Sequence, residues 1–438
     1  MEAFPWFWYG LQLISWLAGI YIIAKNGWRK SWGLILVAGL YFLYNWFVPV
    51  SDWFTGVSSF FGYQLSSDPA LLSEIGKVYA FGSIILIGSY FVTLRFLKQK
   101  QLPDLTFFNE LLIDKSFIII GLLTLTWSVI LWNVHASGIS LIAVFSLKNQ
   151  SERDILFSAD FFSSGIDLLT NCLPTAIFLL ALSNPKQRSI LLLLLGFWLA
   201  FSLLAGWRYR IILLLLMFLG WGVRHYNWSV SKLLIFGVLI SISLAWLTLN
   251  RMAIAKRQFH LVTNDLRQFD FQILTQELSN SRTFHATLQN IEENKIEQGG
   301  VSSWIHHLSN KLQPKTDFEN GERPKPWILT VTKEWIPPGW PYNPNPAVSQ
   351  MEEFYLTFGW LGLFIGMSLM GMSVALFDYP FQSTGIQVFQ IICIALCFQW
   401  ISRGFFLYQL QISAAALLPF ALVCLSHAYL RHVRPNKA

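Results

Sequence analysis

The sequence is poor in charge and in cysteine, and each shortage excludes a class of protein. Asp, Glu, Lys and Arg make up only 13% of the 438 residues, which is typical of a chain surrounded by lipid rather than water. No cysteine lies in the long polar segment at 251 to 353, so neither a disulfide framework nor a zinc site is indicated there. Buried free thiols are expected within apolar segments, at Cys172, Cys393, Cys397 and Cys424.

The sequence also lacks the common motifs for metals and nucleotides. The polar segment holds four histidines without a His-Glu-x-x-His, Asp-x-Asp or clustered carboxylate motif, so we expect no metal and no cofactor. No phosphate-loop or nucleotide-sugar motif is found, which argues against an activated nucleotide donor. The net charge of +7 is spread mostly along one side of the predicted membrane protein, so it does not predict nucleic-acid binding.

Long apolar stretches dominate what is present. The chain is 54% apolar, with 20 Trp and 37 Phe and a mean hydropathy of +0.48, which predicts a polytopic membrane protein. Crossing the hydrocarbon layer takes about 20 residues per helix. About eleven stretches qualify, at 5–24, 32–50, 77–94, 116–134, 163–183, 189–206, 211–223, 232–249, 354–377, 386–402 and 408–429. The seventh is short, and 136–146 is a candidate re-entrant piece.

The distribution of basic residues predicts the direction of the chain. Glu2 and the absence of a basic region before the first stretch indicate an uncleaved span rather than a signal peptide. With the amino terminus outside and the carboxyl terminus cytoplasmic, every short cytoplasmic loop is basic. The opposite short loops are acidic or mixed. The exceptions are Arg208, Arg210 and Arg403, which fall at outward-facing membrane edges.

This pattern divides the chain into three parts: eight spans in 1–250, a large outer loop at 251–353, and three spans in 354–438. The loop carries eleven Lys or Arg and twelve Asp or Glu, so it is charge-balanced. Phe284, Leu288 and Ile291 recur at helical spacing and predict an amphipathic helix. A second short amphipathic piece around Trp304 and Ile305 is suited to the membrane surface.

The second half of the loop combines prolines with aromatic residues. Eight prolines between Pro314 and Pro346 predict extended, rigid backbone rather than helix. Trp and Tyr side chains provide the flat apolar faces that bind sugar rings, and the candidates are Trp327, Trp335, Trp340 and Tyr342. The alternative is an ordered lid whose aromatic residues lie at the level of the lipid headgroups.

Several segments together resemble the Wzy-type polymerases, which join lipid-linked repeat units of O-antigen or exopolysaccharide. The resemblance spans nearly the whole chain but depends on short motifs: Gly206-Trp-Arg-Tyr-Arg210, the Pro-rich loop, Met351-Glu-Glu-Phe-Tyr-Leu-Thr-Phe-Gly-Trp-Leu-Gly362, and Ser402-Arg-Gly-Phe-Phe. The related O-antigen ligases usually carry a His-Asn pair before the re-entry into the membrane, and 348–352 has no His. The resemblance implies a helical bundle of the kind seen in lipid-linked glycosyltransferases (GT-C-like), in the bacterial cytoplasmic membrane. It implies as partners polyprenyl-diphosphate-linked oligosaccharides, membrane lipids and a chain-length regulator.

Such an enzyme must stabilise the negative charge that grows on a departing diphosphate. Arginine suits this task because it is always protonated and its planar guanidinium group donates two parallel hydrogen bonds to phosphate oxygens. The candidate ligands are Arg208 and Arg403 first, followed by Arg210 and Arg282. The alternative for each is an arginine that extends to lipid phosphates and anchors a helix end.

An acceptor hydroxyl also calls for a general base. Asp167 lies on one face of the predicted fifth span with Asp160, Ser164 and Asn171, so it is a candidate base, sugar ligand or ion-pair partner of an arginine. His285 has a suitable intrinsic pKa and lies one turn from Arg282. Glu352 and Glu353 precede the ninth span and would serve equally well as helix caps. The sequence does not choose among these groups.

The interpretation that best fits these features is a metal-independent, inverting glycosyl transfer. Two alternatives stay open: a ligase-type glycosyltransferase, and a flippase or transporter of the same lipid-linked glycans. A transporter does not need a large ordered outer loop and often shows internal repeats, of which none is evident. A non-catalytic scaffold would leave Arg208, Arg403 and Asp167 unexplained.

Overall fold

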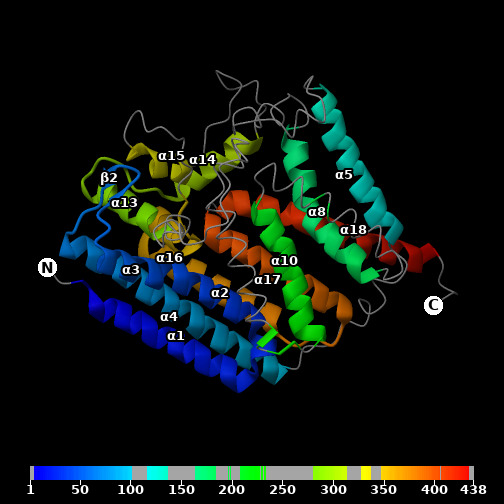
Figure 1. Cartoon of the computed structure of the whole chain (residues 1–438), viewed down its shortest axis with the longest axis horizontal. Helices are drawn as coiled ribbons and strands as arrows, with labels where there is room; N and C mark the ends of the chain where they lie inside the picture. The colour runs from blue at the N-terminus through cyan, green and yellow to red at the C-terminus, as the bar shows by residue number, and fades with distance from the viewer. Residues whose placement is uncertain are drawn as a thin grey trace, which may run out of the picture. The chain divides into compact units, whose positions relative to one another are not determined.

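The computed structural model describes residues 4–100, 116–136, 163–183, 208–226, 280–312, 327–336, 347–404 and 406–433, with a few isolated positions between 196 and 232. These residues are almost entirely helical (Figure 1). Among them, six helical segments are long and apolar enough to cross a membrane: Trp6–Asn26, Trp28–Thr55, Pro69–Lys100, Gln350–Asp378, Thr384–Ser402 and Gln409–Tyr429. The protein is therefore a helical membrane protein.

These six segments cover the first three and the last three predicted spans. The fourth, fifth and seventh predicted spans coincide with α5 (Ser116–Ala136), α8 (Ser163–Ser183) and α10 (Arg208–His225). Apart from isolated positions such as Trp198, the sixth and eighth predicted spans lie outside the described residues. The same holds for 137–146, which follow α5, and for 251–279 of the loop. The count of eleven spans stays a prediction.

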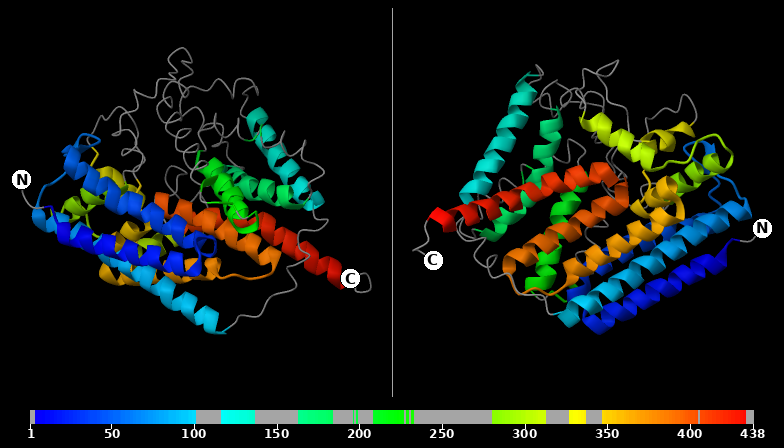
Figure 2. Two further views of the ribbon diagram at one scale, coloured as in Figure 1. Left: turned by 60° about the horizontal axis from the view of Figure 1, so that its bottom comes forward. Right: turned by 180° about the vertical axis from the view of Figure 1, so that it is seen from behind.

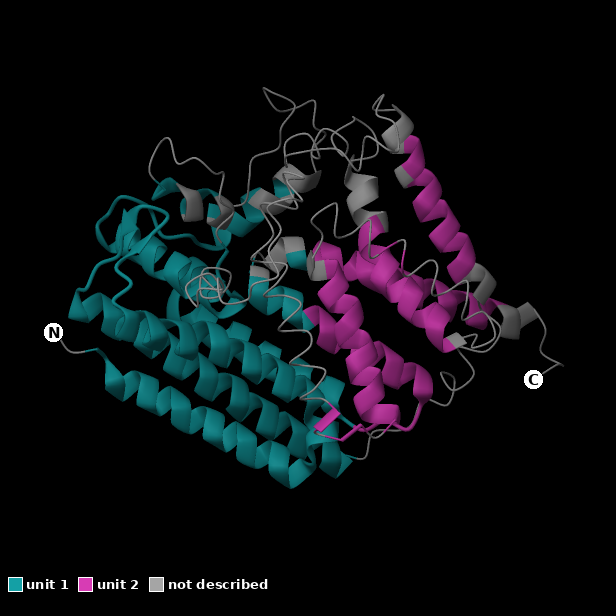
Figure 3. Ribbon diagram, in the orientation of Figure 1, with its two compact units in different colours: residues 1–102, 275–379, 397–409 teal, residues 103–274, 380–396, 410–438 magenta. Residues whose placement is uncertain are grey.

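The chain divides into two compact units (Figure 3). Unit 1 comprises residues 1–102, 275–379 and 397–409, and unit 2 comprises 103–274, 380–396 and 410–438. In unit 2, α8 packs against α5 and α10, and Phe178, Trp198, Met217 and Ile392 are among the buried core side chains. The helices α17 (Thr384–Arg403) and α18 (Phe406–Val433) each begin in one unit and end in the other.

Unit 1 is built around α4 (Pro69–Lys100), which packs against α1 (Trp6–Asn26) and α16 (Gln350–Asp378). These helices run side by side in the right-hand view of Figure 2. Their facing residues form one apolar core that includes Trp16, Val78, Leu86 and Met367. The outward faces of α1, α4 and α16 expose large apolar side chains, such as Ile14, Phe91 and Leu361, as expected for helices in contact with lipid.

The second span is a composite helix. It passes from a 3-10 turn η1 (Trp28–Ser31) through α2 (Trp32–Phe42) and a π turn η2 (Leu43–Phe47) into α3 (Val48–Thr55). Pro49, in the first turn of α3, has no N–H to donate to the preceding turn, which explains the widened π turn before it. A short hairpin follows, with β1 (Ser59–Phe60) antiparallel to β2 (Tyr63–Gln64).

A buried carboxylate holds the start of α2. Asp378, the last residue of α16, accepts hydrogen bonds from the backbone N–H groups of Gly33 at 2.7 Å and Leu34 at 2.9 Å. It also accepts one from the Tyr90 hydroxyl at 3.1 Å. Because the first N–H groups of a helix have no partner within the helix, this charge caps α2 and ties α2, α4 and α16 together at one end.

The polar loop contributes three described helices to unit 1: α13 (Asn280–Glu292), α14 (Val301–Leu312) and α15 (Trp327–Glu334). The predicted helix from Phe284 to Ile291 is confirmed by α13. The expectation that the Pro-rich half contains no helix is wrong for α15. The ten residues between Pro326 and Pro337 contain no proline, which leaves every backbone N–H available for a short helix.

Candidate functional site

The first candidate residues lie on α13, which rests against the end of the membrane helices of unit 1. Its residue Phe284 is fully buried, with ring centroids 5.8 Å from Tyr79 and 6.0 Å from Tyr355. The helix also contacts η2, α3 and α4. The apolar face of α13 is therefore buried against the membrane helices, as its amphipathic pattern predicts. Arg282 and His285, on the same helix, lie at the same end of these helices.

Arg282 forms a bidentate ion pair with Asp52 in the last turn of α3. Its Nε lies 2.8 Å from Oδ2 and its Nη2 lies 2.6 Å from Oδ1 of the carboxylate. The two side chains are only 5% and 13% exposed, and the guanidinium also lies 5.9 Å from the centre of the Phe60 ring. In this structure, the predicted diphosphate ligand Arg282 is thus already paired with a carboxylate, and it joins α13 to the second span.

His285 lies one turn further along α13 and carries a buried nitrogen without a hydrogen-bond partner, Nε2. Burial lowers the pKa of the imidazole to about 4, and a hydrogen bond to the backbone of Ser66 raises it only in part. The ring is therefore neutral near pH 7. In the neutral ring one nitrogen carries a lone pair, and Nε2 without a partner can accept a proton or a hydroxyl hydrogen bond when it is that nitrogen.

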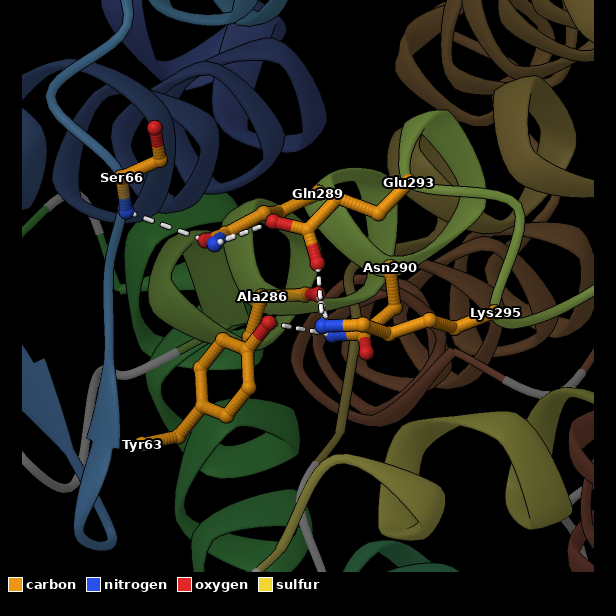
Figure 4. Close-up of polar contacts among 7 residues, drawn as sticks. All are labelled: Tyr63, Ser66, Ala286, Gln289, Asn290, Glu293 and Lys295. Atoms are coloured by element: carbon orange, nitrogen blue, oxygen red, sulfur yellow. Dashed lines mark hydrogen bonds and ion pairs between the residues drawn. The ribbon is translucent and has the colours of Figure 1, made fainter.

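The polar side of α13 is held in place by the hairpin and the segment that follows it (Figure 4). The backbone N–H of Ser66 donates to Gln289 at 3.0 Å, and the amide of Gln289 donates to Glu293 at 3.0 Å. The Nδ2 group of Asn290 donates to the Tyr63 hydroxyl at 2.8 Å. These bonds order the two turns after His285, so the imidazole lies on a supported helix.

Glu352 and Glu353 lie in the first turn of α16 and are almost completely buried. Glu352 forms a capping box with Ser349, in which each side chain bonds the backbone N–H of the other residue. It also accepts a hydrogen bond from the Tyr79 hydroxyl at 2.8 Å. The hypothesis that one of the two carboxylates caps this helix is confirmed for Glu352, and its engagement disfavours the alternative role of general base.

α16 is not one straight span but turns sharply at Gly359. This residue has φ 63° and ψ −150°, a conformation that is essentially restricted to glycine. A methyl group at Gly366 would overlap the ring of Phe354, so the segment 350–358 folds back along the rest of the helix. The remaining 19 residues, 360–378, span about 28 Å at 1.5 Å per residue, close to the thickness of the hydrocarbon layer.

Three helix ends meet where α16 begins. The amide of Asn280, in the first turn of α13, donates to the carbonyl of Ser402 in the last turn of α17 at 3.1 Å. Gly404, with φ 54°, lies so close to Val348 that a Cβ there would overlap the Val348 carbonyl oxygen. We call the first turns of α13 and α16 and the residues Ser402 to Gly404 the three-helix junction. The backbone of Arg403 lies in it, and its side chain lies outside the described residues.

The junction unites motifs that are far apart in the sequence. Ser402-Arg-Gly, the start of the segment 351–362 and the helix with Arg282 and His285 all belong to unit 1. The amino terminus of α16, whose first turn carries Glu352 and Glu353, therefore lies beside the backbone of Arg403. An arginine beside the partly positive N–H groups of a helix amino terminus is suited to an anionic ligand.

The other candidate arginines belong to unit 2. Arg210 is 2% exposed, and its Nε donates to Oδ1 of Asn171 on α8 at 3.0 Å. The sequence placed Asn171 on the polar face of α8. Arg210 of α10 therefore packs against the polar face of α8. Arg208 begins α10 and Asp167 lies in α8, but their side chains, like all of Asp160, lie outside the described residues.

The predicted sugar-binding aromatic residues have different environments. Trp335 is only 4% exposed, packs against Phe60 and Tyr63 of the hairpin, and donates from Nε1 to Thr287 at 3.3 Å. A side chain so buried presents no open ring face to a sugar, so in this conformation its role is packing. Trp327 is half-buried at the start of α15. Trp340 and Tyr342 lie outside the described residues.

Comparison with family models, with curated proteins and with solved structures finds no match to this chain. The resemblance to Wzy-type polymerases therefore stays a hypothesis. The function has to be argued from the junction and its chemistry.

Two residues that shape the site were missed in the sequence. The capping residue Ser349 had a readable signal, because Ser-x-x-Glu before an apolar stretch is typical of a helix start. The pairing of Asp52 with Arg282 had none, because the two residues are 230 positions apart. Only the packing of α13 on α3 brings them together.

Proposed function

We propose that this protein is a polysaccharide polymerase. It transfers a polyprenyl-diphosphate-linked glycan to a lipid-linked repeat unit at the outer face of the bacterial cytoplasmic membrane. The observation that best supports the proposal is the three-helix junction, where the backbone of Arg403 meets the first turns of α13 and α16. At this junction the polar loop packs on the membrane helices. A substrate with a lipid tail and a charged head would fit there, with the tail in the membrane and the head at the junction.

The proposed reaction breaks the bond between the first sugar and the diphosphate, while an acceptor hydroxyl forms the new glycosidic bond. Negative charge develops on the departing diphosphate, which leaves with the bonding electron pair. Arg403 would bind it through two parallel hydrogen bonds from its guanidinium group. By analogy with oxyanion-hole donors, a preorganised group of this kind stabilises the transition state by about 3 to 4 kcal/mol. Arg208, the first residue of α10, is the alternative candidate for binding the diphosphate.

The acceptor proton is assigned to His285. Its Nε2 is buried without a hydrogen-bond partner near the start of α13, whereas the carboxylate of Glu352 is engaged in capping α16. The imidazole is held neutral by burial, as a base must be before it accepts a proton. The negative diphosphate would raise its proton affinity when substrate binds. Inversion at the sugar carbon follows from a single displacement, and no metal is invoked.

The test is the length of the polysaccharide made by cells. Cells lacking the protein would be complemented with the wild type, Arg403→Ala, Arg403→Lys or the control Arg95→Ala, with insertion and amount of each variant checked. Arg95 is an exposed arginine near the end of α4, so its loss should leave the ladder of chain lengths unchanged. Arg403→Ala should leave single capped repeats, and Lys should recover little because it lacks the planar fork.

Other outcomes would point elsewhere. A normal ladder in cells without the protein would overturn the polymerase proposal. Long chains that stay on the lipid carrier would indicate a ligase. Repeat units that accumulate on the cytoplasmic side would indicate a transporter. A normal ladder with Arg403→Ala would show that Arg403 is not needed for the reaction. Arg208 would then be the remaining candidate for binding the diphosphate.

A further inference from the structure

α14 has an apolar edge that no described part of unit 1 covers. Val301 and Ile305 are 62% and 61% exposed, although both are large apolar residues on one side of the helix. In the sequence, this side continues through Leu308 and Leu312, at the spacing of a helical stripe. An exposed apolar stripe on a helix outside the membrane spans calls for a partner.

The position of α14 is set by its contact with the turn of α16. Trp304 lies edge-on against Phe358, with ring centroids 4.9 Å apart. The connector before α14 is tied to the same place, because the Gln298 amide donates to the Tyr355 carbonyl at 3.5 Å. α14 therefore lies beside the point at which α16 turns. Both elements belong to unit 1 (Figure 3).

The residues that follow this turn indicate that it lies near the boundary of the hydrocarbon layer. The straight part of α16 begins at Trp360, and its exposed residues are those of a lipid-facing helix: Trp360 at 42%, Leu361 at 69% and Phe364 at 58%. Tryptophan at the end of a span is typical of the headgroup level. Since Phe358 lies two residues before Trp360, the helix that packs on it lies at the same depth. The exposed edge of α14 thus lies at the depth where the exposed apolar residues of α16 begin.

The charge of α14 fits the same partner. The segment from Val301 to Leu312 contains Lys311 and two histidines and no acidic residue. A helix with an apolar edge and basic polar residues is typical of segments that lie in the plane of a membrane with anionic lipids.

We propose that α14 lies in the membrane interface, with Val301 and Ile305 inserted among the acyl chains of the leaflet next to the turn of α16. The proposal does not depend on the reaction proposed above, because it concerns how the polar loop is anchored rather than what it binds. The partner is the bilayer itself.

The experiment compares the lipid contact of two neighbouring residues. An environment-sensitive NBD label would be attached to Ile305→Cys or to the control His306→Cys, in full-length protein in phosphatidylcholine vesicles containing about one-fifth phosphatidylglycerol. His306 is also exposed, but it lies about 100° further around the helix. Three native cysteines are buried and Cys424 is partly buried, so unsubstituted protein treated with the label gives the background.

The label at position 305 should be quenched several-fold more by lipids with a shallow doxyl group than by iodide in the buffer, and the label at 306 should show the reverse. Val301→Cys should behave like Ile305→Cys. Equal quenching by iodide at 305 and 306 would overturn the proposal. Protection of position 305 from both quenchers would also overturn it, and it would indicate a second copy or another protein on this edge. Size-exclusion profiles matching the unsubstituted protein would confirm that each variant is folded.

Discussion

The ion pair between Arg282 and Asp52 gives the most direct test of how the polar loop is attached to the membrane helices. The structure pairs two buried charges at 2.6 and 2.8 Å across α13 and α3. The informative changes are Arg282→Met, Asp52→Asn and the two together. Methionine keeps much of the length of the arginine stem, and asparagine keeps the shape of the carboxylate, so the substitutions remove charge with little change in packing.

The expected magnitude follows from the burial of the pair. Two unit charges about 4 Å apart attract by about 4 kcal/mol at an effective dielectric constant of about 20. The loss of water from both groups offsets much of that attraction in the intact pair. Arg282→Met leaves the buried carboxylate without its charged partner, so it should lower the free energy of unfolding by about 3 to 5 kcal/mol. The double variant leaves neither charge and should lie within about 1 kcal/mol of the wild type. The coupling between the two changes should thus be at least about 2 kcal/mol.

The free energy of unfolding would be measured by titrating SDS into the purified protein in dodecylmaltoside micelles, with circular dichroism as the signal. The control is Lys77→Met, which breaks the ion pair with Glu74, where the side chains are 37% and 23% exposed. That change should cost less than about 1 kcal/mol. If the effects of Arg282→Met and Asp52→Asn simply add in the double variant, the pair does not hold α13 in place. If Arg282→Met alone is as mild as the control, the pair is not buried as described.

Two further predictions concern His285 and Gly359. The pKa of His285 is lowered from 6.5 to about 4, so the unfolded chain binds more protons than the folded protein between these pH values. Stability should therefore fall as the pH drops through this window, by up to about 3 kcal/mol. His285→Gln should flatten that slope in unfolding experiments between pH 4.5 and 6.5, and an unchanged slope would contradict the assignment. Gly359→Ala should lower the free energy of unfolding by about 1 to 3 kcal/mol because of its positive φ. Gly88→Ala, in the middle of α4 with open space around it, should be neutral or raise stability by up to about 1 kcal/mol, and equal effects of the two changes would argue against the turn in α16.

Local patterns predicted several elements well. The apolar stretches near both ends of the chain appear as long helices, because a segment in lipid must satisfy its own backbone hydrogen bonds. The stripe through Phe284 and Leu288 predicted α13, because amphipathic spacing reports the side of a helix that becomes buried. Density of proline was a poorer guide. α15 forms between Pro326 and Pro337 because proline acts on the adjacent turn rather than on the whole segment.

The amino-acid sequence by itself determined that this is a helical membrane protein and supplied the candidate functional residues, since hydropathy and residue type are local properties. The tertiary structure alone decided which of them meet. It paired Arg282 with Asp52, turned α16 back at Gly359, and brought the carbonyl of Ser402 to Asn280. The physical reason is that a buried polar group must find a hydrogen-bond partner, and the packing of distant helices determines which partner is within reach.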